Sequence, residues 1–163
     1  MKNIMKLALL ISSVFILFTF NAKAGGDPKT PVTVAVIDSA LKHQVDSIKY
    51  NLNKEGFVTV KEALMSMESE YELPVIVPLN EGTWYHIVFI GDASSKLFEL
   101  RMFDFNEKQV VYQKQYGQGK DATNIIRYSY IPKFSEYHMI KPVQVNKKKK
   151  NMNGYIMLFK KVK

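Results

Sequence analysis

The sequence contains no cysteine among its 163 residues. Disulfide bonds, thiol nucleophiles and metal sites with cysteine ligands are therefore excluded. Small exported domains often depend on disulfides, so a chain of this kind has to be stabilised by its hydrophobic core. The sequence also has no G-x-S-x-G turn, no Glu-x-x-His pair and no complete phosphate-binding loop. We therefore expect no enzymatic site and no cofactor.

Long hydrophobic runs are scarce, and the single one lies at the N-terminus. Lys2 and Lys6 precede an apolar run over residues 7–20. As a helix, that run would be about 21 Å long, whereas a bilayer core of about 30 Å needs about 20 apolar residues. A short apolar core, a basic start and Ala22 and Ala24 before Gly25 are typical of a signal peptide. We predict cleavage after Ala24; an uncleaved membrane anchor is the alternative.

Residues 25–163 would then be the mature chain, which suits one domain in length. Gly-Gly, Asp-Pro and Thr-Pro pairs mark residues 25–37 as a lead-in segment, and residues 38–163 form the predicted domain. No second apolar run approaches membrane-spanning length, so no transmembrane segment is expected in the mature chain. The expected location is periplasmic or extracellular.

A helix is predicted over residues 39–54. Leu41, Val45, Ile48 and Leu52 recur at spacings of four, three and four, which places them on one helix face. Asp38 or Ser39 precedes this stripe and can cap the first amide groups. Gly56 follows it, where a left-handed backbone commonly ends a helix.

Residues 57–72 fit two patterns. Val60, Leu64, Met67 and Tyr71 have helical spacing, whereas alternation from about Met65 into residues 75–77 indicates a strand. The alternation is longer, so we favour the strand. It would place Glu68, Glu70 and Glu72 on one strand face, where carboxylates discourage pairing between sheet edges. The alternative use of paired carboxylates is glycoside chemistry.

The rest of the chain is rich in aromatic and β-branched residues and is divided by turn residues. Such a series of short strands is typical of an antiparallel β-sandwich or jelly-roll-like domain, here with one N-terminal helix. The expected strands lie near residues 83–90, 97–102, 109–116, 125–130, 137–145 and 155–159.

Residues 73–159 resemble the bacterial pre-peptidase C-terminal type of β-sandwich module. The resemblance is carried by Leu79, Gly82 and Tyr85 opening a strand, by Ile131-Pro132, and by Tyr137-x-Met139-Ile140. Glu136 stands where these modules usually have glycine. The resemblance implies a sandwich with an accessory role and no active site to transfer. The whole chain also resembles small exported proteins of Bacteroidota.

Lysines are concentrated near the C-terminus. Residues 133–163 carry a net charge of +8, whereas residues 25–132 carry −3. Lys147, Lys148, Lys149 and Lys150 are consecutive, and we expect them at a hairpin tip, with Lys141, Lys160, Lys161 and Lys163 adding to their potential. Such a surface attracts anionic polysaccharide, a lipid surface or an acidic envelope protein, and export argues against nucleic acid. The alternative is a solvated loop that keeps the protein soluble.

Aromatic side chains suggest a second candidate surface. Trp84, Tyr128 and Tyr130 could form an exposed platform that stacks on sugar rings, although most aromatics of a sandwich lie in its core. The three histidines have no metal-binding spacing, and His86 and His138 would have to meet in space to bind a metal.

Together these features predict an exported, non-enzymatic binding or accessory module of the bacterial cell envelope. The alternatives are an exported hydrolase whose site the sequence does not reveal and a structural component of an envelope complex that associates through sheet edges.

Overall fold

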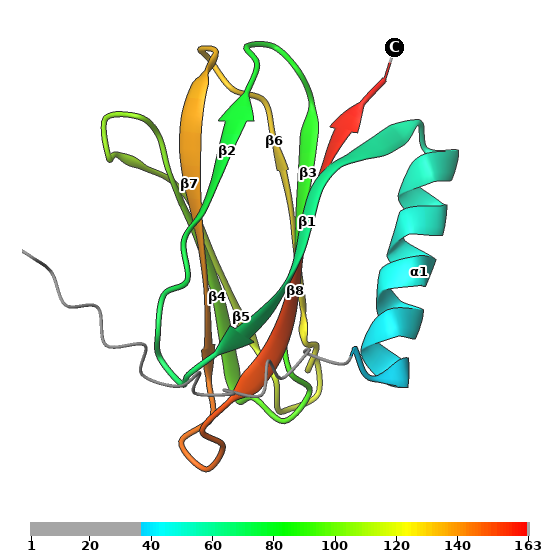
Figure 1. Ribbon diagram of the computed structural model, residues 1–163, viewed down its shortest axis with the longest axis vertical. Helices are drawn as coiled ribbons and strands as arrows, with labels where there is room; N and C mark the ends of the chain where they lie inside the picture. Colours follow the sequence, from blue (N-terminus) through cyan, green and yellow to red (C-terminus); the bar gives the residue numbers. More distant parts are fainter. Residues whose placement is uncertain (1–36, 163) are drawn as a thin grey trace, which may run out of the picture. The chain divides into compact units, whose positions relative to one another are not determined.

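The computed structural model describes residues 37–162, which form a β-sandwich with one helix on an outer face (Figure 1). Each sheet has four antiparallel strands, in the orders β1-β8-β3-β6 and β2-β7-β4-β5. The predicted fold class is confirmed. The elements are α1 (Ser39–Lys54), β1 (Phe57–Met67), β2 (Val75–Leu79), β3 (Tyr85–Ile90), β4 (Leu97–Phe103), β5 (Gln109–Tyr116), β6 (Ile125–Tyr130), β7 (Glu136–Val145) and β8 (Met152–Lys161).

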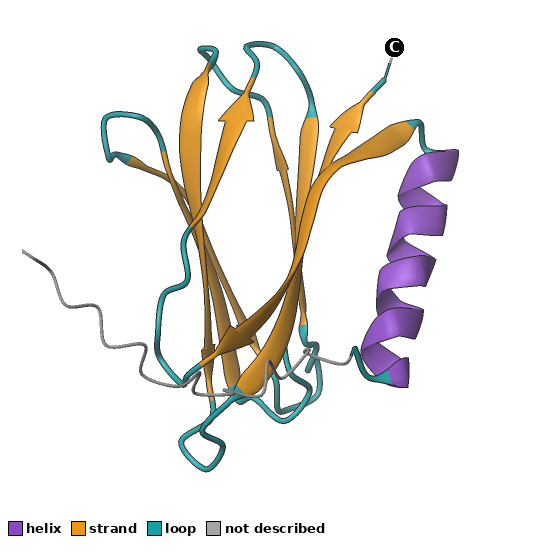
Figure 2. Ribbon diagram, viewed as in Figure 1, coloured by secondary structure: helices purple, strands orange, loops and turns teal. Residues whose placement is uncertain are grey.

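The helix occurs where its apolar stripe predicts it. The carboxylate of Asp38 accepts a hydrogen bond of 2.7 Å from the amide of Leu41, which caps the first turn. The four stripe residues are buried against β1, β3 and β8. Gly56 then turns the chain with a φ of 77°, a conformation that glycine adopts without steric cost. The helix therefore covers one outer face of the sandwich (Figure 2).

The main core lies between the two sheets. Phe89, Phe98 and Ile87 are among its fully buried members, and they come from strands of both sheets. Alternate residues of β4 face inward, as the period-two pattern requires. Burial of such side chains from water is the main source of stability for a domain without disulfides.

The ambiguous segment is a strand, but with different bounds from those we favoured. β1 begins at Phe57, and ten of its eleven residues pair with β8, with one shift of register at Val60. It ends at Met67, and a loop over residues 68–74 then leads to β2 in the other sheet. The predicted strand running from Met65 to residue 77 is therefore wrong, because the chain changes sheets where the sequence continues to alternate. Within that loop Glu70 has a φ of 68°.

The three glutamates of this segment consequently do not share a strand face. They lie in the loop, where Glu72 forms ion pairs with Arg101 and Lys141 at 2.6 and 3.0 Å. These contacts lower the pKa of Glu72, with the hydrogen bond from Lys141 as the largest cause. The carboxylate of Glu72 thus helps to fix the loop on the sheet.

Candidate functional site

The lysine run lies in the loop between β7 and β8, at the lower end of the sandwich in Figure 1. The expected hairpin is wrong, because β7 and β8 belong to different sheets. The loop therefore crosses from one sheet to the other. All four lysines are exposed there, and they border a shallow hollow of about 330 Å³ with Glu68 and Ser69.

Two of the four lysines have acidic partners that are distant in sequence. The Nζ atom of Lys149 lies 2.5 Å from a carboxylate oxygen of Asp92, and that of Lys147 lies 3.8 Å from Glu70. Within residues 37–162, Lys148 and Lys150 form no ion pair. The free positive charge of the loop is thus smaller than the sequence indicates.

The other lysines expected to reinforce the loop lie elsewhere. Lys141 contacts Glu72 and the ring of Phe103 on the open face of the second sheet. Lys160 and Lys161 end β8, whose other end begins beside the lysine loop. Lys163 lies outside the described residues. The lysines that were expected to form one basic surface are therefore spread over the length of the sandwich.

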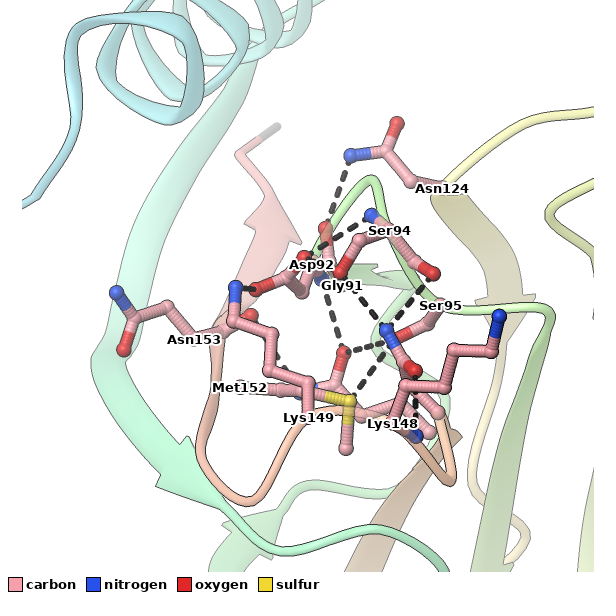
Figure 3. A network of polar contacts seen from close by, with 11 residues as sticks. Gly91, Asp92, Ser94, Ser95, Asn124, Lys148, Lys149, Met152 and Asn153 are labelled. Carbon is pink, nitrogen blue, oxygen red and sulfur yellow. Dashed lines mark hydrogen bonds and ion pairs between the residues drawn. The ribbon is translucent and has the colours of Figure 1, made fainter.

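A partly buried polar network holds the lysine loop against the end of the sandwich (Figure 3). The side-chain oxygen of Gln144, a residue with no exposed surface, accepts from the amide of Asp92 at 2.9 Å. Asn146 donates to the carbonyl and hydroxyl oxygens of Ser94, both at 3.0 Å. Burial opposes ionisation of Asp92, but hydrogen bonds from Lys149 and Ser94 outweigh it, so the pKa of this carboxyl is lowered. The network connects the two sheets and fixes the start of the loop.

The predicted aromatic platform is not assembled. Trp84 packs against Phe57 and His86 beside the helix-covered face, with ring centroids 5.4 and 5.9 Å away. Tyr128 and Tyr130 instead pack against the core between the sheets. Trp84 therefore lies on the opposite face of its sheet from the two tyrosines.

The end of the sandwich opposite the lysine loop has two adjoining hollows. The larger has a volume of about 620 Å³ and lies between the β4–β5 turn and the β6–β7 loop. The second, of about 440 Å³, lies beside β2 and the start of β7. Glu136 lines both hollows. We call this pair the loop-end crevice.

Large apolar side chains are exposed along the loop-end crevice. Phe105 and Phe134 are 70% and 67% exposed, and Ile131 and Tyr137 are also exposed. Each of the four lines one of the two hollows. Exposed apolar side chains that gather around a hollow are typical of binding sites, whereas scattered ones are ordinary. This end is the stronger candidate for a functional site.

Polar groups meet the same crevice. The hydroxyl of Tyr130 lies 3.2 Å from Nε2 of His138, and Nδ1 of His138 lies 3.4 Å from the carbonyl oxygen of Glu136. A carboxylate oxygen of Glu136 also lies 3.7 Å from Nε2, so both ring nitrogens of His138 face polar partners. Burial, with the carboxylates of Glu136 and Asp104, raises the pKa of Tyr130. The phenol therefore stays protonated at neutral pH.

The sequence did not single out Phe105, Ile131 or Phe134. Its available signal was a large apolar residue beside turn residues, as in Asp104-Phe105-Asn106 and Ile131-Pro132. An apolar residue in a strand is explained by its burial in the core. An apolar residue in a turn has no such explanation. Only the fold shows that these turns meet at one end.

The remaining histidines do not form a metal site. His86 packs on Phe57 and lies 3.1 Å from the hydroxyl of Ser129, and burial lowers its pKa. Among residues 37–162, no group of three or more histidine or acidic side chains is arranged to hold a metal ion. No helix in that same part of the chain is long and apolar enough to cross a membrane.

No family model and no curated protein matches this chain. Solved structures of infectious bursal disease virus show similarity: the VP2 subviral particle with a TM-score of 0.37 and the Gt strain with 0.35, both at 11% identity. The match covers 63% of this chain but 32% and 31% of those chains, so the chain spans about a third of their length. The resemblance to pre-peptidase C-terminal modules stays a prediction.

Proposed function

We propose that this protein is an exported, non-enzymatic binding module that holds its ligand in the loop-end crevice. The observation that carries the proposal is the pair of hollows that share Glu136, with Phe105, Ile131, Phe134 and Tyr137 exposed on their walls. Apolar walls with a few convergent polar groups are the usual composition of a ligand site.

The polar groups of the crevice favour binding over catalysis. His138 is 1% exposed, and both of its ring nitrogens already have partners. A carboxylate oxygen of Asp104 accepts from the amides of Asn106 and Lys108, which stabilises its own turn. General acid–base catalysis needs a group that reaches the reacting atoms, and these two groups are engaged elsewhere.

The test uses nuclear magnetic resonance of the purified protein with a library of small neutral, acidic and basic compounds. Ligands of the crevice should shift the amide signals of residues 104–110 and 130–137 and leave those of residues 146–151 unchanged. The paired variant Ile131→Ser with Phe134→Ser should abolish these shifts, whereas Tyr71→Ser, an equally exposed change outside the crevice, should not. Shifts confined to other regions, or shifts that survive in the paired variant, would contradict the proposal.

The exported part of the proposal rests on residues 1–24, which lie outside the described residues. The mass of the protein recovered from its producing cells tests it. A mass that begins at Gly25 is expected, and a mass that includes residues 1–24 would refute cleavage.

A second candidate function is contact with an anionic surface through the lysine loop. It is favoured by Lys148 and Lys150, which are exposed and have no ion pair within residues 37–162. This function is compatible with the first, because the lysine loop and the β6–β7 loop, which lines the crevice, lie at opposite ends of the sandwich (Figure 1).

A further inference from the structure

A third hollow adjoins the loop-end crevice. It has a volume of about 440 Å³ and is lined by residues 81–84 and by Lys161. Asn80, which lines the second hollow, is the residue next to Glu81. The second and third hollows are thus lined by neighbouring residues of the β2–β3 loop, and Glu136 lines both the first and the second.

The loops between these hollows are connected by hydrogen bonds. The amide of Glu81 donates to the hydroxyl of Ser135 at 2.9 Å, and the amide of Gly82 donates to the carbonyl oxygen of Pro132 at 3.0 Å. The carbonyl of Trp84 accepts from the amide of Lys161 at 2.8 Å. These bonds join the β2–β3 loop to the β6–β7 loop and to β8, so the hollows have fixed positions relative to one another.

Each hollow presents an exposed aromatic ring. Phe134 lines the first, Phe105 and Tyr137 the second, and Trp84 the third. Trp84 is 43% exposed, and its ring packs on Phe57 and His86, with Nζ of Lys161 5.8 Å from its centroid. A ring held in this way presents apolar area at a low cost in conformational entropy. Repeated rings at successive positions suit a ligand with repeated flat apolar faces.

The charges around the three hollows balance. Asp104, Glu136 and Glu81 contribute three carboxylates, and the lysines contribute three ammonium groups: Lys108, Lys133 and Lys161. Lys108 and Lys133 form no ion pair with any residue in the range 37–162. A site with equal numbers of ammonium donors and carboxylate acceptors suits a neutral ligand rich in hydroxyl groups, because a hydroxyl both donates and accepts hydrogen bonds.

We propose that the ligand of the loop-end crevice is a neutral oligosaccharide of at least three sugar units, extended over Phe134, Phe105 and Trp84. This inference rests on the proposed function and names its ligand class. The sugar rings stack on the aromatic side chains, and their hydroxyl groups bind the carboxylate, ammonium and amide groups between them. The phenol of Tyr130, kept protonated, adds a hydroxyl to the first hollow.

A peptide fits this end less well. Extended peptides commonly bind by adding a strand to a free sheet edge, and β2 is the edge strand that borders the second hollow. Pro78 in β2 has no amide hydrogen, and the carbonyl of Ile76 already accepts from Nζ of Lys61 at 2.9 Å. This edge is therefore blocked for strand addition.

The experiment is titration calorimetry with the protein recovered from its producing cells. The probes are neutral oligosaccharides of glucose, galactose, mannose or N-acetylglucosamine, one to six units long, with oligogalacturonates and apolar pentapeptides for comparison. At least one neutral series should bind, with affinity rising up to three units and then levelling off. Trp84→Ala should weaken binding of the trisaccharide about tenfold and leave the monosaccharide unchanged, because one stacked ring contributes up to about that factor.

Two further variants locate the site. Phe134→Ala should weaken every chain length, whereas Tyr71→Ala, which replaces an aromatic residue outside the crevice, should change none. Phe134 and Tyr71 are exposed, so their variants should melt like the wild type. Trp84→Ala removes a contact with Phe57 and should melt lower but remain folded at the temperature of the titration. Failure of every neutral series to bind overturns the oligosaccharide inference.

The outcomes separate this inference from the proposed function. Binding of pentapeptides or of oligogalacturonates alone, weakened by Phe134→Ala, would overturn the neutral oligosaccharide but support a ligand site in the crevice. Sugar binding that neither Phe134→Ala nor Trp84→Ala weakens would overturn both.

Discussion

Lys149 and Asp92 are 57 positions apart in sequence and form an ion pair of 2.5 Å. The pair joins the β7–β8 loop to the loop that follows β3, and thus one sheet to the other. Asp92 is only 12% exposed at its side chain, so the pair is better shielded from water than a typical surface ion pair. Lys149 belongs to an exposed charge run in the sequence, but in the fold it stabilises the contact between two loops.

The lowered pKa of Asp92 predicts a specific loss of stability in acid. A carboxyl whose pKa is lower in the folded than in the unfolded state contributes stability above its ordinary value, here 3.8, and loses it as pH falls through the folded value. At pH 7 we expect Asp92→Asn to lower the free energy of unfolding by about 1 kcal/mol. Below about pH 4 the variant and the wild type should converge.

Denaturant unfolding of both proteins at several pH values between 7 and 3 measures this convergence. Asp121→Asn, a change at an exposed aspartate, is the control and should follow the wild type throughout. A constant difference between wild type and Asp92→Asn at all pH values would show that the charge of Asp92 is not responsible.

Tyr130→Phe should destabilise the protein through His138. The variant removes the hydroxyl that lies 3.2 Å from Nε2 of this buried imidazole. A buried polar group left without its hydrogen-bond partner costs about 1–3 kcal/mol. Tyr128→Phe changes the neighbouring ring, 6.4 Å away, and should stay within about 0.5 kcal/mol. Equal midpoints for the two variants in thermal unfolding would refute a stabilising Tyr130–His138 contact.

Gly117→Ala should destabilise the protein strongly, although Gly117 is only half-buried. A methyl group there would lie 2.0 Å from the carbonyl oxygen of Ser95 and 3.0 Å from the ring of Phe98. Because the nearest atom belongs to the backbone, the clash is relieved only by moving the chain, which costs about 1–3 kcal/mol. Gln118→Ala at the next, exposed position should have little effect. A midpoint of Gly117→Ala that equals that of the control would contradict the close approach.

The sequence predicted the helix and the strands because the hydrophobic pattern of each one lies within its own segment of the chain. The stripe from Leu41 to Leu52 repeats over about three turns and specifies α1 without reference to the rest of the chain. The strands alternate in the same self-contained way. What alternation does not specify is the sheet to which a strand belongs. β1 and β2 read as one continuous strand, and β7 and β8 read as a hairpin, although each pair is divided between the sheets.

The candidate site was less accessible from the sequence than the fold. Phe105 and Phe134 come together with Glu136 only because two turns meet at one end of the sandwich. Likewise, Glu70 and Asp92 reach the lysine loop from other parts of the chain. Contacts of this kind depend on the topology, and a count of charges along the chain does not reveal them.

The lysine loop gives the last prediction, which uses two variants with the same change in net charge. In 0.15 M salt, screening limits the long-range attraction to about 8 Å, so direct contact of an ammonium group with a lipid phosphate dominates. Lys148 and Lys150 can make this contact without breaking an ion pair, whereas Lys147 and Lys149 have to leave Glu70 and Asp92.

Each lysine at an anionic membrane contributes about 1 kcal/mol. We therefore expect Lys148→Ser with Lys150→Ser to weaken retention on phosphatidylserine vesicles about tenfold or more, and Lys147→Ser with Lys149→Ser less than about threefold. The second pair alone should lower the unfolding midpoint. Equal losses of retention, or no retention of the wild type, would show that the loop is a solvated surface and not a contact site.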